Sequence, residues 1–220
     1  MSLINRAEVP ESWQWYVHPN RDIYYYNLGM RLLSTDDIRK PDIRAVVVGI
    51  RNEYYEDLAQ DSDFQHLPID WVMTITDCNI MDRTALVAIH SRTAGKSYEW
   101  IEDRGLVEKP KEHFWAHIAE YPAHDKSIPS ALEDQFVRAL SNAQQKTKEN
   151  RVFPLDGSQI EAVIRQYNYL KAGQAHGNQK ATACIAWLMG AVMPLDELKD
   201  DSSGARISDD LIHALTRVHI

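Results

Sequence analysis

Two histidines, His113 and His117, lie four residues apart in a segment that is expected to be helical. Residues at that spacing share one helix face, so both imidazoles could bind the same metal ion. Glu120 and His124 could supply further ligands. A closed zinc site needs a third and a fourth ligand, and no Glu follows His113 as it does in metalloprotease helices. The pattern therefore favours a structural role for His117, and we expect no bound metal and no cofactor.

A second set of candidates comes from positions that are far apart in the sequence. His90 and Trp100 fall in strand-like segments and could lie near the helix that carries His117. We therefore predict four ligand-binding residues, namely Tyr25, His90, Trp100 and His117. If the protein is an enzyme, the predicted catalytic residues are His90, His117 and Glu120.

Other catalytic motifs are missing from the sequence. Cys78 and Cys184 match no metal or redox spacing and predict two reduced thiols. The nine glycines are scattered, so no phosphate-binding loop is predicted. The acidic pairs are Asp36-Asp37, Asp200-Asp201 and Asp209-Asp210. A turn explains the first and the positive end of a helix explains the last, so they do not predict a magnesium site.

Composition narrows the class of protein. The chain has 220 residues and a net charge of −8, which argues against nucleic acid as a partner because phosphate-backbone binding needs a basic face. No apolar run approaches the ~20 residues of a membrane helix, and there is no apolar signal segment at the start. We therefore expect a soluble intracellular protein, cytoplasmic or nuclear, with no membrane role.

Two β-rich stretches are expected to position the candidate residues. Trp13 to Pro41 is predicted to form a three-stranded antiparallel meander, with Tyr25 on the opposite face from its two tyrosine neighbours. Trp71 to Glu102 reads as a second meander. Between them, Asp42 to Leu58 has apolar residues near the helical period and Asp42 can cap the helix, while Gln60 to Pro68 reads as a linker.

The remainder of the chain is predicted to be helical. Lys109 to Tyr121 forms the first helix, and capping boxes at Ser130–Glu133 and Ser158–Glu161 open two more. Gln179 to Met193 is apolar nearly all round, which predicts a buried central helix. Ser208 is expected to cap a short final helix.

The first meander resembles a WW domain. Trp13, the run Tyr24-Tyr25-Tyr26-Asn27 and Pro41 match that module's first Trp, its central Tyr-Tyr-x-Asn and its closing Pro. Thr35 stands where the second Trp of the module is expected. That Trp forms half of the aromatic groove that grips proline-rich ligands. The resemblance therefore implies a retained structural core without a working proline-rich clamp.

The order of motifs from about Val9 to Ala205 resembles the WW-domain-containing proteins of mushroom-forming (basidiomycete) fungi. His90 with Trp100 resembles the second module of that group, and His113–Pro122 resembles its Tyr-Trp-x-His-Val-Glu-x-Phe-Pro signature. Many members continue into a longer, membrane-associated part, whereas this sequence ends at Ile220. That departure from the group's pattern predicts a soluble, self-contained version, and the resemblance implies no particular biochemical activity.

Together these elements predict an α+β fold in which two small, WW-like antiparallel β meanders pack with a C-terminal α-helical bundle. The predicted domains are residues 1–44 for a degenerate WW-like meander, 45–68 for a helix and linker, 69–108 for the second meander and 109–220 for the bundle.

Two functions from different classes follow from this fold. The first is an interaction module that binds a partner protein or peptide through the WW-like meanders docked on the bundle. The alternative is a small-molecule-binding protein or an enzyme, with its site between the meanders and the bundle. A closed pocket lined by the four predicted ligand-binding residues would favour the alternative, whereas an exposed aromatic groove would favour the interaction module. We favour the interaction module, since no catalytic motif is present.

Overall fold

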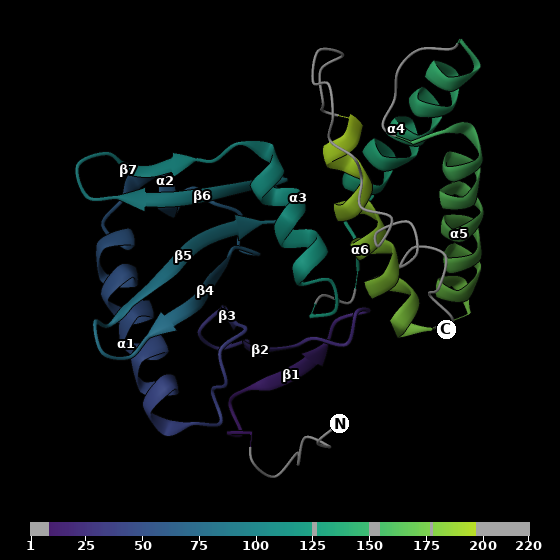
Figure 1. Ribbon diagram of the computed structural model, residues 1–220. Coiled ribbons are helices and arrows are strands. Elements are labelled where there is room, and N and C mark those ends of the chain that lie inside the picture. Colours follow the sequence, from purple (N-terminus) through teal and green to yellow (C-terminus); the bar gives the residue numbers. More distant parts are fainter. Residues whose placement is uncertain (1–8, 125–126, 150–154, 177, 197–220) are drawn as a thin grey trace. The chain divides into compact units, whose positions relative to one another are not determined.

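The computed structural model describes residues 9–124, 127–149, 155–176 and 178–196. Within these residues the fold is α+β, with seven strands and six helices (Figure 1). The chain divides into two compact units. Unit 1 holds the described residues of Met1–Val17 and Asp22–Phe114, and unit 2 holds those of His18–Arg21 and Trp115–Ile220.

Unit 1 is built on one mixed sheet whose strands lie side by side in chain order. Neighbouring strands are antiparallel except for β3 and β4, which run parallel. The strands are β1 (Gln14–Val17), β2 (Ile23–Asn27), β3 (Leu32–Ser34), β4 (Val72–Asn79), β5 (Thr84–Ser91), β6 (Lys96–Ile101) and β7 (Gly105–Glu108).

The prediction of two separate small antiparallel meanders is wrong, because β3 and β4 join both stretches into this single sheet. Leu32 pairs with Met73 and Leu33 pairs with Thr74. The Met73 N–H also donates to the Arg31 carbonyl at 2.9 Å. A parallel pair needs a crossover connection between its strands, and such non-local pairing leaves no mark on the local alternation from which each hairpin was predicted.

The crossover contains two helices, α1 (Pro41–Leu58) and α2 (Ser62–Gln65). Pro41, the closing proline of the WW pattern, is the first residue of α1, a position where its missing N–H costs nothing. The N-cap is Lys40, which makes no side-chain cap hydrogen bond, so the predicted cap at Asp42 is wrong. The predicted linker contains α2, where Asp61 accepts hydrogen bonds from two backbone N–H groups.

The main core of unit 1 lies between α1 and one face of the sheet. Residues of the sheet in this core include Tyr25, Leu32, Met73, Ile75 and Ile89, and α1 contributes Val47, Ile50 and Leu58. Tyr24 instead stacks on Tyr16 at 5.5 Å between ring centroids, so Tyr25 and not its neighbours packs in the core against α1. The opposite orientation of these adjacent tyrosines follows the alternation expected along a strand.

Strand β7 was not predicted from the sequence. Gly105 begins it with a φ of 69°, a left-handed conformation that glycine adopts without strain. The next N–H, that of Leu106, donates to the Asp61 carboxylate at 3.0 Å. Asp61 therefore ties the start of β7 to the helix α2 that it also caps.

The helices of unit 2 pack against one another through α4 (Ser130–Lys148), α5 (Gly157–Ala175) and α6 (Gln179–Asp196). The helix α3 (Lys111–Glu120) begins in unit 1 and enters unit 2 at Trp115. The predicted α5 cap is displaced by two residues, since the capping box is formed by Asp156 with Gln159. The predicted cap of α4 is also wrong, because its N-cap is Pro129.

The apolar helix α6 is buried as its sequence predicts. Ile185, Leu188 and Met189 are each at most 1% exposed. No helix among the described residues is both long and apolar enough to cross a membrane. The predicted leader up to residue 8, the final helix at Ser208, and the pairs Asp200-Asp201 and Asp209-Asp210 lie outside the described residues.

Two helical glycines of unit 2 give a test of its packing. A Cβ at Gly190 of α6 would lie 2.6 Å from the Trp115 carbonyl oxygen and 2.7 Å from the Ala119 Cβ, so Gly190→Ala should destabilise the protein by about 1–3 kcal/mol. At Gly173 of α5 the nearest atom is 3.6 Å away, so Gly173→Ala should stabilise it by up to about 1 kcal/mol through helix propensity. Urea unfolding of both variants measures the two changes, and the same sign at both positions would contradict the packing of α3 on α6.

Candidate functional site

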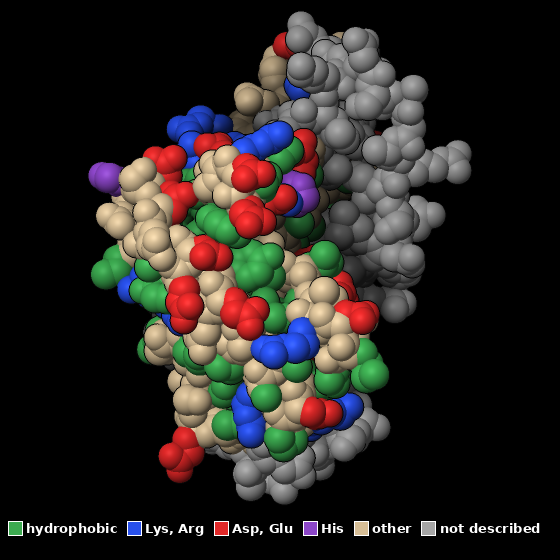
Figure 2. All heavy atoms as spheres, turned by 90° about the vertical axis from the view of Figure 1, so that its left-hand side faces the viewer, with side chains coloured by type: hydrophobic (Ala, Val, Ile, Leu, Met, Phe, Trp, Pro, Cys, Tyr) green, Lys and Arg blue, Asp and Glu red, His purple; other side chains and the backbone are tan. Residues whose placement is uncertain are grey.

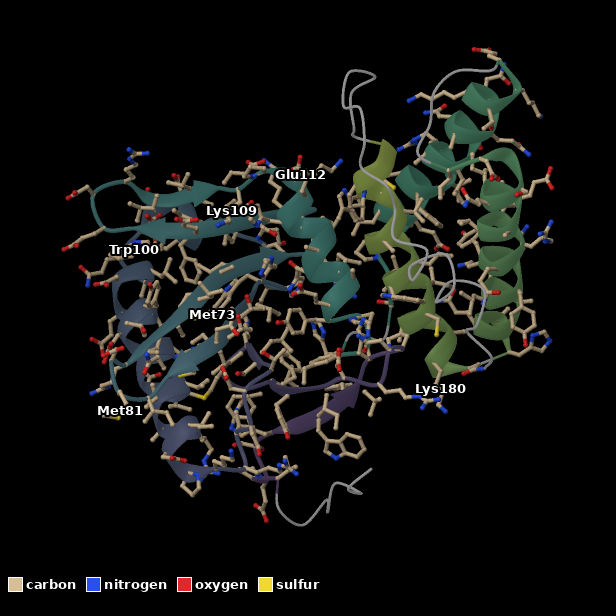
Figure 3. The ribbon with its side chains drawn as sticks, viewed as in Figure 1. Met73, Met81, Trp100, Lys109, Glu112 and Lys180 are labelled. Carbon is tan, nitrogen blue, oxygen red and sulfur yellow. The ribbon has the colours of Figure 1, made fainter. Side chains whose placement is uncertain are left out.

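Tyr25 and Trp100, two of the predicted ligand-binding residues, are part of the core between the sheet and α1. Tyr25 is 3% exposed and its hydroxyl donates to Asp37 at 3.4 Å. Burial, followed by the negative charge of Asp37, raises the pKa of Tyr25 above its usual value. Trp100 of β6, labelled in Figure 3, packs edge-on against Tyr54 of α1 at 6.1 Å between ring centroids. Both rings therefore have structural partners.

His90 lies on the opposite face of the sheet from Trp100. In β5 and β6, Ile89 pairs with Tyr98 and His90 pairs with Ser97. Ile89 belongs to the core under α1, and side chains alternate along a strand, so His90 points to the other face. Trp100, two residues after Tyr98, shares the face of Ile89. The sheet thus separates the two residues that were expected to line one pocket.

A hydrogen-bond network surrounds the buried His90 ring. Its Nδ1 lies 2.6 Å from Ser97 Oγ and its Nε2 lies 3.1 Å from Thr74 Oγ1. The Thr74 hydroxyl donates to the Ala88 carbonyl at 3.3 Å. Its oxygen is then left to accept from Nε2–H, and Ser97 donates to Nδ1. Both ring nitrogens are therefore engaged by neighbouring strands.

The chemistry of this network favours a structural role. Burial lowers the pKa of His90 to about 3, with smaller contributions from the positive charges of His113, Lys109 and Arg92. A histidine with so low a pKa is a weak general base near neutral pH, where the best bases have a pKa close to the working pH. Ser97 is 1% exposed, so a substrate has no access to its hydroxyl. The Ser–His pair is a satisfied polar cluster within the fold.

The remaining candidates belong to α3 and the segment after it. His117 is 3% exposed. The centroid of its ring lies 5.2 Å from that of Tyr121 and 6.1 Å from that of His124. His113 and Glu120 are exposed. Although His113 and His117 are four residues apart, one is therefore in solvent and the other is buried. Among the described residues, no group of three or more His, Cys, Asp or Glu side chains could hold a metal ion.

The predicted catalytic set is divided between the two units. His90 belongs to unit 1, and His117 and Glu120 belong to unit 2. The ligand-binding set divides in the same way, with Tyr25 and Trp100 in unit 1. Neither unit by itself contains either set.

Unit 1 does contain an open groove that the sequence did not reveal. This hollow of about 600 Å³ lies among the start of β3, the C-terminal half of α1, α2 and the start of β4. We call it the Arg31–Trp71 groove, and its lining residues are Gly29, Arg31, Arg51, Tyr55, Ala59, Phe64, Gln65, Leu67, Ile69 and Trp71. Figure 2 views the molecule from the side on which α1 lies in Figure 1, and exposed apolar side chains lie between charged ones on this face.

Four of the lining side chains form a ladder of cations and rings. The rings of Tyr55 and Trp71 are stacked, with centroids 6.1 Å apart and planes inclined by 26°. The Arg51 guanidinium lies over Tyr55 at 4.2 Å, and that of Arg31 lies over Trp71 at 5.0 Å. Both distances are within the ~6 Å range of cation–π attraction. Phe64 supports the ladder, with its ring 4.9 Å from that of Trp71.

The ladder is positioned by α1, by the starts of β3 and β4, and by α2. Arg51 and Tyr55 are four residues apart in α1, so they share one face of the helix. Arg31 and Trp71 directly precede β3 and β4, and the ends at which parallel strands begin lie at the same edge of a sheet. The N-terminal cap of α2 fixes the buried Phe64 beneath them.

The sequence could have revealed only part of this site. Arginine and tyrosine at helical spacing, as at Arg51 and Tyr55, are a recognisable cation–π pair. The approach of Arg31 to Trp71 depends on the parallel strand pair, which the local pattern does not show.

Comparison with protein-family models, with curated proteins and with solved structures finds no match to this chain.

The His90 network predicts a pH dependence of stability. The pKa of His90 is about 3 in the folded protein and ordinarily 6.5. Below pH 6.5 the unfolded chain therefore binds a proton at this histidine that the folded protein does not bind. The contribution of neutral His90 to the free energy of unfolding is complete above pH 6.5. It is lost as the pH falls toward 3, by up to about 1.4 kcal/mol per pH unit. The free energy of unfolding, measured from pH 4 to 7, should change less with pH in His90→Gln than in the natural protein. If the free energy of unfolding changed equally with pH in both proteins, folding would not lower the pKa of His90.

Proposed function

We propose that this protein is an interaction protein that binds a peptide segment of a partner protein, and that the Arg31–Trp71 groove is its binding surface. The observation that carries the proposal is the cation–ring ladder along an open hollow. Tryptophan, tyrosine and arginine are the residue types that most often dominate the energy of protein interfaces.

The exposure of the groove supports a peptide over an enclosed small molecule. Ile69 is 82% exposed and Tyr55 is 36% exposed. Small-molecule sites usually bury most of the ligand in a concave pocket, whereas an extended peptide covers an open surface. Ile69 provides apolar area that a bound side chain would remove from water. Phe64 and Trp71 are buried at the base of the groove.

The proposed surface differs from the one that the WW pattern suggested. Binding was expected on the meanders, with Tyr25 and Trp100 among the contacts, and both rings belong to the core instead. The groove uses Trp71 and Tyr55, which the pattern did not include. Membership of the fungal WW-domain-containing group stays a prediction.

The enzyme alternative has less support. His90, the predicted catalytic histidine of unit 1, is buried and its pKa is lowered to about 3. We therefore propose binding without catalysis.

A library of random 12-residue peptides displayed on phage and panned against the purified full chain tests the proposal. An enriched peptide, made synthetically with a fluorescent label, should bind the natural protein in a polarisation assay. Ile69→Ser should weaken binding about tenfold, since loss of one buried aliphatic contact removes roughly 1–2 kcal/mol. Because Ile69 is exposed, the substitution should leave the unfolding midpoint unchanged.

The matched control is Met81→Ser. Met81 is 90% exposed at the β4–β5 turn and does not line the groove (Figure 3). It should leave peptide binding unchanged. If no peptide is enriched, or if Met81→Ser and Ile69→Ser act alike, the groove is not the binding surface.

A further inference from the structure

The two arginines of the groove lack acidic partners in the described part of the chain. Neither Arg31 nor Arg51 makes an ion pair there, whereas Arg39 and Arg83 each bind a carboxylate. The groove lining contains no Asp or Glu. The whole chain has 32 acidic and 24 basic side chains, so a carboxylate-free surface with two arginines is a local exception.

Stacking leaves the hydrogen-bonding edge of each guanidinium available. A guanidinium that lies on a ring uses its face for the cation–π contact, and its N–H groups point outward in its own plane. Arg51 donates through Nη1 to Asn52 at 3.2 Å, and its Nε is buried, so its Nη groups are the ones that a partner can reach. Planar N–H pairs of this kind bind carboxylate and phosphate oxygens in a bidentate manner.

Arg31 has a left-handed backbone, as Arg21, Asp77 and Arg83 also do. Its φ is 51°, in the left-handed region where an arginine is strained and a glycine is not. The β2–β3 turn and strand β4 hold it there, because its N–H donates to the Leu28 carbonyl within the turn and its carbonyl accepts from Met73 of β4. Glycine at this position would relieve the strain but would remove the cation that lies over Trp71.

We propose that the Arg31–Trp71 groove selects acidic peptide segments, with a carboxylate or a phosphate on each guanidinium and apolar side chains against Tyr55 and Ile69. This inference rests on the proposed function and adds the chemistry of the partner. Two arginines at one groove can hold a short acidic segment, whereas a nucleic-acid backbone needs a broad basic face, against which the net charge of −8 argues.

Three pools of fluorescein-labelled 12-residue peptides test the chemistry. Every third position is fixed as Glu, Gln or Lys, and the other positions are randomised over uncharged residues. The Glu pool should bind the full chain at least tenfold more tightly than the Gln pool, and the Lys pool should bind least. The preference should fall as the salt concentration rises, because exposed charges are screened.

Arg31→Gly separates a binding role from a structural one. It should remove most of the preference for Glu over Gln while leaving the unfolding midpoint unchanged or higher, since glycine suits the left-handed backbone. Arg51→Gln should also reduce the preference. Arg104→Gln is the matched control, because Arg104 is exposed in the β6–β7 turn and does not line the groove, and it should keep the preference.

The outcomes distinguish the two proposals. If the Gln pool binds as tightly as the Glu pool and Ile69→Ser weakens both, the groove binds peptides but the acidic preference is wrong. If no pool binds, both proposals are wrong. If phosphatidylserine vesicles bind and Arg31→Gly abolishes this while no pool binds, the groove recognises a lipid surface and the peptide proposal is overturned.

Discussion

The parallel pairing of β3 with β4 is the constraint on which the rest of unit 1 depends. It joins two antiparallel hairpin systems into one sheet and requires the chain between them to cross over one face. The crossover supplies α1, whose apolar side covers the core, and α2, whose cap also binds β7. The same pairing brings Arg31 next to Trp71. The groove is therefore a consequence of the strand order and does not need a separate loop to form it.

Two kinds of environment surround the polar side chains of unit 1. In the sheet, His90 is held neutral by burial and bonded to Ser97 and Thr74, so it contributes to the fold and has little capacity for acid–base chemistry. At the groove, the guanidinium groups of Arg31 and Arg51 lie over rings and form no ion pair with a described carboxylate. The first arrangement satisfies buried polar atoms, and the second leaves charge available for a partner. The difference between the buried His90 and the two groove arginines favours binding over catalysis.

The sequence predicted local features well and long-range features poorly. Alternation placed Tyr25 on its own face of the first hairpin system, and the apolar character of α6 predicted the burial of Leu188. The helix caps were missed because Pro129 and Asp156 compete with nearby Ser residues that also suit a cap. The parallel strand pair could not be predicted, since it joins residues about forty positions apart and the hydrophobic pattern is the same with or without it. The groove was missed for that reason.

The most direct test of the account is the backbone NOE pattern between β3 and β4 in isotopically labelled protein. We predict contacts in the parallel register that pairs Leu32 with Met73 and Leu33 with Thr74, together with slow exchange of the Met73 N–H that binds the Arg31 carbonyl. Absence of these contacts, with rapid exchange along β3, would mean that the two hairpin systems are separate. Arg31 would then have no reason to lie beside Trp71, and the groove with its proposed partner would be lost.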